Sequence, residues 1–122
     1  MELQKLEYDF TVCKVENTGQ IDFSRDFVFL SKTDDEISLV CESAYVPANT
    51  IVVESGWKGL RIVGVLDFGL VGILAKIATI LADADISIFA VSTYNTDYIF
   101  IKDTHFDNAI KTLISNGYAL KH

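Results

Sequence analysis

The sequence predicts an α+β fold, in which a strand-rich first half is followed by a half that alternates strands with helices. Two observations support this prediction. No segment before residue 56 has the 3.6-residue hydrophobic period of a helix, whereas after residue 59 the period switches repeatedly between 2 and 3.6. Half of the 122 residues are hydrophobic and 22% are charged, so the chain has enough apolar surface to form a core.

The sequence of the second half predicts four strands and two helices in the order β-α-β-β-α-β. The strands are expected at residues 60–66, 86–91, 97–102 and 118–120. The helices are expected from apolar residues at helical spacing: Leu70, Ile73, Leu74, Ile77, Ile80 and Leu81, then Phe106, Ile110, Leu113 and Ile114. This order is that of a ferredoxin-like unit, an antiparallel four-stranded sheet with both helices on one face.

Residues at the ends of these elements refine the prediction. Asp67 precedes the first helix and is a plausible N-cap. Asp85 follows that helix where a glycine is usual, and aspartate can adopt a left-handed conformation at some cost. Gly117 is a good C′ residue for the second helix. The run Ile86–Val91 is apolar on both faces, which predicts a central strand that is covered on both sides.

The first half predicts strands at residues 6–15, 27–30 and 36–41. The last two flank the acidic turn Asp34–Asp35 and are expected to form a β-hairpin. Cys13 and Cys41 both lie in apolar strands, so buried free thiols are expected; a disulfide between them, or a metal pair, is the alternative.

The charge is distributed unevenly and suggests a boundary. Residues 1–59 carry 11 acidic and 5 basic residues, whereas residues 60–122 carry 6 and 5. The glycines of Gly56–Gly59 lie at the join. We therefore expect a strand-rich half over residues 1–58 and a second unit over residues 59–122, with the first half packed beside the second because about 60 residues are marginal alone.

Composition excludes several classes of function. A net charge of -7 leaves no electrostatic footprint for nucleic acid or for an anionic membrane. No apolar segment reaches the roughly 20 residues that span a bilayer, and no signal peptide is evident, so a cytoplasmic protein is expected. The sequence contains no phosphate loop, no metal-spaced cluster and no nucleophile–base set, so we expect no enzyme activity, no cofactor and no metal.

Three stretches of the second half resemble a known family. Leu60–Ala75 resembles the opening of an ACT domain: a strand, a turn with aspartate and glycine, and a helix rich in leucine and isoleucine. Leu81–Ile88 is similar to the exit from that helix, and Ser92–Tyr98 to the hairpin of small stand-alone tandem-ACT proteins and of the related mammalian cytosolic arginine sensor. Ser31–Cys41 and Ser55–Leu60 resemble the first half of the same group.

The resemblance implies a fold and a function. ACT domains are the amino-acid-sensing regulatory modules of aspartate kinase and related enzymes. It therefore implies two ACT-like halves that form a non-catalytic module, bind an amino acid at an ACT–ACT interface and assemble as a homo-oligomer, most simply a dimer. The alternative is a structural or protein-interaction module with a vestigial pocket. Phe68 replaces a proline that is frequent in the family's turn.

The candidate ligand-binding residues lie in two segments, a helix start and a hairpin turn. A helix start supplies N–H donors for a carboxylate, and an acidic side chain can hold an ammonium group. Gly69 and Gly72 give a ligand access or form a tight turn; Asp67 caps the helix or binds the ammonium; the hairpin residues form a polar wall or a plain turn. The full set is Asp67, Phe68, Gly69, Leu70, Val71, Gly72, Ser92, Thr93, Asn95 and Asp97.

Overall fold

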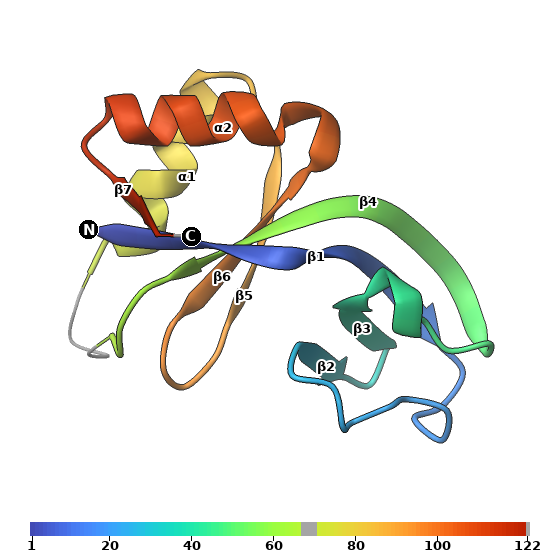
Figure 1. Cartoon of the computed structure of the whole chain (residues 1–122). Coiled ribbons are helices and arrows are strands. Elements are labelled where there is room, and N and C mark those ends of the chain that lie inside the picture. The colour runs from blue at the N-terminus through green and yellow to red at the C-terminus, as the bar shows by residue number, and fades with distance from the viewer. Residues whose placement is uncertain (67–70, 122) are drawn as a thin grey trace. The chain divides into compact units, whose positions relative to one another are not determined.

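The second half of the chain follows the predicted order of strands and helices. The structure is a computed structural model that describes residues 1–66 and 71–121. The described elements are β1 (Glu2–Val15), β2 (Val28–Lys32), β3 (Ile37–Glu42), a 3₁₀ turn η1 (Ser43–Tyr45), β4 (Thr50–Ile62), α1 (Ile73–Asp83), β5 (Ile88–Ser92), β6 (Asp97–Lys102), α2 (Asp103–Ser115) and β7 (Ala119–Lys121) (Figure 1).

The chain divides into two compact units. Residues 1–7 and 58–122 form one, here called the helical unit, and residues 8–57 form the other, called the strand unit. β1 and β4 each contribute residues to both. The division differs from the expected halves at the N-terminus, because the first residues of β1 pair with β7, Glu2 opposite Ala119, in a parallel ladder.

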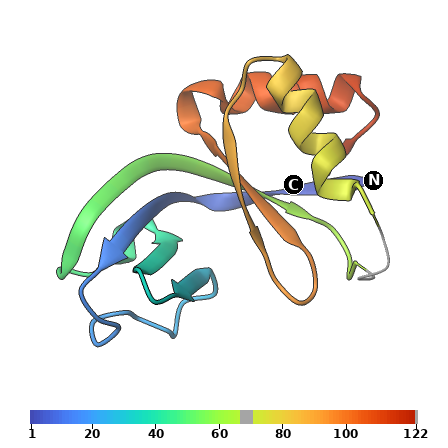
Figure 2. The same cartoon turned by 180° about the vertical axis from the view of Figure 1, so that it is seen from behind.

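The helical unit is a sheet with two helices on one face (Figures 1 and 2). Its strand order is β7-β1-β4-β6-β5, so the start of β1 enters the four-stranded sheet that the sequence predicted. Alternate residues of β4 and β6 point to the helices. Together they form the core with the buried residues of both helices: Leu60, Ile62, Ile99 and Ile101 with Ile77, Leu81, Phe106 and Leu113.

The structure corrects the prediction of a central strand over Ile86–Val91. β5 is instead the last strand of this unit, paired with β6 alone in the described strand order. Its side chains are half-buried or exposed, with Ala90 exposed. An apolar run marks a strand that can bury surface, but periodicity does not tell a central strand from an edge strand.

The limits of the first helix also differ from the prediction. α1 begins at Ile73, and its N-cap position is Gly72, which has φ 77° in the left-handed region that favours glycine. Asp67, Phe68, Gly69 and Leu70 lie outside the described residues. The strand expected to reach residue 66 ends at Ile62.

Both helices end in the way that the sequence predicts. After α2, Gly117 takes φ 94°; its N–H donates to the Ile114 carbonyl, and the Tyr118 N–H donates to the Leu113 carbonyl. After α1, Asp85 occupies the same position with φ 62°. These bonds form the Schellman motif, which satisfies carbonyls in the last helical turn.

The strand unit has the strand order β2-β3-β1-β4. β2 and β3 form the predicted antiparallel hairpin, with Ser31 opposite Ser38. One face of the sheet carries a small core that contains both thiols, Cys13 and Cys41, which are free and buried. Burial raises the pKa of Cys41 to about 12 and that of Cys13 in the same direction, so both are held as neutral thiols.

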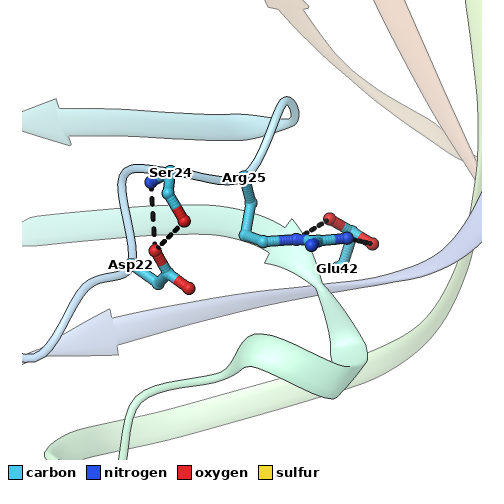
Figure 3. Close-up of polar contacts among 4 residues, drawn as sticks. All are labelled: Asp22, Ser24, Arg25 and Glu42. Atoms are coloured by element: carbon cyan, nitrogen blue, oxygen red, sulfur yellow. Dashed lines mark hydrogen bonds and ion pairs between the residues drawn. The ribbon is translucent and has the colours of Figure 1, made fainter.

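An ion pair fixes the loop before β2 to β3. The Arg25 guanidinium donates through Nε and Nη2 to the two carboxylate oxygens of Glu42, at 3.1 and 3.3 Å (Figure 3). The Glu42 side chain is buried, and Arg25 stacks on the Tyr45 ring with 4.2 Å to the centroid. A two-point contact of this kind sets the position of the loop more firmly than a single hydrogen bond.

Candidate functional site

A pocket of about 290 Å³ opens in the helical unit where the start of α1 meets the turn between β5 and β6. Three segments line it: the segment that follows β4, the first turn of α1, and the turn between β5 and β6. Its lining residues are Leu66, Gly72, Ile73, Leu74, Ala75, Ser92, Thr93, Tyr94, Asn95, Thr96 and Asp97.

The α1 side of the pocket offers backbone donors. The first N–H groups of a helix have no acceptor within the helix, and no side chain of residues 1–66 or 71–121 caps the start of α1. A Cβ placed on Gly72 would meet nothing within 4 Å, so the approach to this turn is open. The helix start can therefore receive an anionic group, which the helix dipole also favours.

The hairpin side of the pocket is a tightly bonded turn. The Thr93 N–H donates to the Thr96 carbonyl at 2.9 Å, and the Thr93 hydroxyl donates to the same carbonyl at 3.0 Å. The buried hydroxyl of Thr96 donates to the Ile62 carbonyl at 2.7 Å. The Leu66 N–H donates to the Asn95 carbonyl at 2.7 Å. These bonds attach the turn to the segment that follows β4 and give the pocket a fixed wall.

Asp97 gives the pocket its charge. It is half-buried and is the one charged residue among the described lining residues. It begins β6 and is paired in register with Ser92, the last residue of β5. The pocket thus combines a carboxylate at one wall, helix N–H donors at another, and the apolar side chains of Leu66, Ile73 and Leu74. The carboxylate is complementary to the cationic end of a zwitterion, the N–H donors to its anionic end, and the apolar side chains to an apolar side chain.

The structure brings together five of the ten predicted ligand-binding residues: Gly72, Ser92, Thr93, Asn95 and Asp97 all line the pocket. The start of α1 and the hairpin turn therefore lie side by side at one pocket. Val71 is 90% exposed and lines a second hollow with Lys76 and Asn116. The other four, Asp67 to Leu70, lie outside the described residues.

Sequence reasoning missed several lining residues. Leu66, Ile73, Leu74 and Ala75 were assigned to secondary structure, and Thr96 to the turn. Tyr94 was also missed: it sits beside the pocket with 79% of its surface exposed. Its place in the middle of a polar turn was the signal, since a large aromatic ring gains nothing from exposure to water. The Thr93 hydroxyl is used within the turn, which matches the plainer interpretation of this residue.

Two further observations concern other classes of site. Within the described residues, no group of three or more His, Cys, Asp or Glu side chains is arranged to hold a metal ion. Across the same part of the chain, no helix is both long enough and apolar enough to cross a membrane.

Comparison with protein families identifies the chain. Residues 52–115, more than half of its length, match the family described as ACT domain. The chain belongs to the ACT domain family.

Solved structures extend the likeness over nearly the whole chain. A protein from Agrobacterium tumefaciens is 26% identical, with 99% of this chain and 93% of that one covered at a TM-score of 0.83. A Vibrio cholerae protein described as a possible transport protein is 22% identical, with 93% and 88% covered at 0.72. The regulatory subunit of aspartate kinase from Thermus thermophilus is 10% identical, with 93% and 95% covered at 0.64.

Comparison with curated proteins gave no match. The general kind of function is indicated by the family and by the solved structures. The ACT family match, together with the fold shared with aspartate kinase regulatory domains, points to a regulatory, small-ligand-binding module rather than a catalytic one.

Proposed function

We propose that this protein is an amino-acid sensor whose ligand occupies the pocket between α1 and the β5–β6 turn. One observation carries the proposal: the pocket places a carboxylate, helix N–H donors and apolar side chains around a space of about 290 Å³. That volume is at the lower end for small-molecule sites and suits a ligand of amino-acid size.

The ligand would be held at both of its charged ends. Its carboxylate accepts hydrogen bonds from the N–H groups of Ile73 and Leu74, where Gly72 lets it approach the backbone. Its ammonium group, or a cationic side chain, pairs with Asp97, beside the polar atoms of Ser92 and Asn95. An apolar part would lie against Leu66. Charge-assisted hydrogen bonds at both ends are what a zwitterion needs to replace its water.

The proposal keeps the segment Asp67, Phe68, Gly69 and Leu70 as ligand-binding candidates. In sequence these residues join Leu66, which lines the pocket, to the start of α1. Val71 remains a candidate on the same ground.

The assembly is part of the same proposal. We place the site at an interface between ACT units, so that a second unit covers the open side of the pocket, and we expect a cytoplasmic homodimer with two ACT-like halves per chain, related to the mammalian arginine sensor. Light scattering at tens of micromolar protein tests the dimer: a mass of 13.6 kDa, that of one chain, would reject it.

A thermal-shift screen of the twenty amino acids tests the binding. A ligand at about 100 times its dissociation constant adds roughly 2.7 kcal/mol to the free energy of unfolding, which moves the melting temperature by several degrees. The expected result is a shift for a small subset of amino acids. If none of the twenty shifts the melting temperature, the pocket is vestigial and the alternative, a structural or protein-interaction module, stands.

A further inference from the structure

A second hollow of about 290 Å³ opens at the start of α1 in the helical unit. It shares Gly72 and Ile73 with the pocket described above, but its other walls come from the first turn of α1 and the end of α2. Its lining residues are Met1, Val71, Gly72, Ile73, Lys76, Asn116, Gly117 and Tyr118. The pocket and the second hollow therefore differ in most of their walls and are separate candidate sites.

The second hollow is basic, whereas the pocket is acidic. Among the lining residues that the structure describes, Lys76 carries the one charged side chain. Lys76 is exposed and forms no ion pair with any residue in 1–66 or 71–121. Its backbone N–H donates to the Gly72 carbonyl in the first turn of α1, and helical side chains lean towards the helix start. The ammonium charge therefore adds to the positive end of the helix dipole.

Tyr118 brings a buried hydroxyl group to the second hollow. This residue is 9% exposed, and its hydroxyl forms no hydrogen bond within the described ranges 1–66 and 71–121. Tyr118 also lines an apolar hollow, which is walled by leucine, isoleucine and alanine and has no room for a water molecule. Buried tyrosine hydroxyls normally find a polar partner, so this donor is available to a molecule in the second hollow. Burial raises the pKa of the phenol, so the hydroxyl keeps its proton and can donate a hydrogen bond to an anion.

The end of α2 also lines the second hollow, and free carbonyl groups there would repel an anion. These carbonyl groups are occupied. Those of Thr112, Leu113 and Ile114 all accept hydrogen bonds from N–H, hydroxyl or amide groups of residues 115–118. The last turn of α2 thus satisfies its own carbonyls, and the positive groups at the start of α1 set the charge of the hollow.

We propose that the second hollow binds a small oxyanion, a carboxylate or a phosphate group, between the Lys76 ammonium, the Tyr118 hydroxyl and the start of α1. Charged donors and helix starts hold such groups by short, charge-assisted hydrogen bonds. Among the described lining residues there is no carboxylate to hold an ammonium group, so a simple anion fits this hollow better than a zwitterion. The proposal does not rest on amino-acid binding, because neither Lys76 nor Tyr118 lines the pocket.

Amide chemical shifts measured with simple anions test the proposal. The ¹⁵N-labelled wild-type protein is titrated separately with sodium phosphate and with sodium acetate, while sodium chloride keeps the ionic strength constant, because salt alone screens a lysine. The expected result is a saturable movement of the signals of residues 76 and 116–118 with at least one of the two anions. The signals of residues 92–97 should stay in place. Saturation by phosphate alone or by acetate alone supports the proposal and names the anion.

Three variants test which groups hold the anion. Lys76→Met removes the charge, and Tyr118→Phe keeps the buried ring but removes the hydroxyl; each should weaken binding by about tenfold with an unchanged circular dichroism spectrum. The control Lys111→Met removes an exposed lysine of α2 outside the lining set and should bind normally.

Two results would overturn the proposal: no saturation with either anion, or full binding by Lys76→Met or Tyr118→Phe. An amino-acid screen without a hit leaves all these outcomes unchanged, so the two proposals fail separately.

Discussion

The two units of this protein stabilise themselves in different ways. The helical unit has a continuous core that two helices and the sheet share, including Leu60, Ile77 and Leu113. The strand unit has a small core around Cys13 and Leu39, a fully buried Phe10 whose ring lies edge-on to that of Phe27, and an ion pair between Arg25 and a buried carboxylate. A closely packed core that helices and sheet share can hold a preformed pocket in place, and the pocket lies in the helical unit.

Truncation of the helical core should give the largest effect. Leu81 is fully buried between the helices and the sheet, so Leu81→Ala should lower the free energy of unfolding by about 3–5 kcal/mol. Val28, half-buried against the small core of the strand unit, should lose only about 1 kcal/mol as Val28→Ala. Urea unfolding measures both. Equal losses would show that the two cores resist truncation alike.

Alkaline pH should lower the free energy of unfolding through the buried thiols of the strand unit. The pKa of Cys41 is 9.0 when unfolded and about 12 when folded, because burial disfavours the thiolate. The unfolded chain therefore loses this proton first, and stability that is complete below pH 9 falls as the pH rises towards 12, by up to about 1.4 kcal/mol per pH unit. Urea titrations should show a shallower alkaline loss for Cys41→Ala. An identical slope in both proteins would contradict a buried neutral thiol.

Affinity for a ligand in the pocket of the helical unit should depend on the carboxylate of Asp97. Asp97→Asn keeps the shape of the side chain but removes its charge, so affinity for an amino acid found in the screen should fall about tenfold or more, equivalent to roughly 1.5–3 kcal/mol. Calorimetry measures the change. Asp103→Asn, at the exposed start of α2, is the matched control and should bind normally. Normal binding by Asp97→Asn would reduce Asp97 to a turn residue.

The smallest effects should come from the two helix ends. Asp85 holds φ 62°, a conformation that costs a non-glycine residue roughly 1 kcal/mol, so Asp85→Gly should stabilise the protein by up to that amount. Gly117→Ala should destabilise it by a similar amount, and only through φ, because a Cβ there meets nothing within 4 Å. Thermal unfolding should show opposite shifts for the two variants. Shifts of one sign would contradict this account of the helix ends.

The spacing of hydrophobic residues predicted most of the helices and strands, but not which strands pair with one another. Helical spacing located α1 and α2, and the turn Asp34–Asp35 located the β2–β3 hairpin. The insertion of β1 beside β7 was not predictable, because Glu2 and Ala119 carry no mark of pairing across the whole chain. For the same reason the apolar run of β5 does not show that this strand is the last of its unit. Strand order depends on long-range packing, which a single sequence does not show.

The candidate site was predictable where local chemistry defines it. The sequence singles out a polar turn ending in Asp97 and a glycine-rich helix start, and the structure places Gly72 of that helix start and the turn residues around one pocket. Leu66 and Ile73 could not be assigned in advance, because an apolar residue that lines a pocket looks the same in sequence as one that fills a core. The ion pair of Arg25 with Glu42 was missed since 17 positions separate the two residues.

Amide chemical shifts in the presence of amino acids test the central claim most directly. A uniformly ¹⁵N-labelled sample is titrated with the twenty amino acids in pools at millimolar concentration. The account predicts that an active pool moves the amide signals of residues 72–75 and 92–97, while those of residues 28–42 in the strand unit stay in place. No movement with any pool, or movement confined to the strand unit, would contradict it.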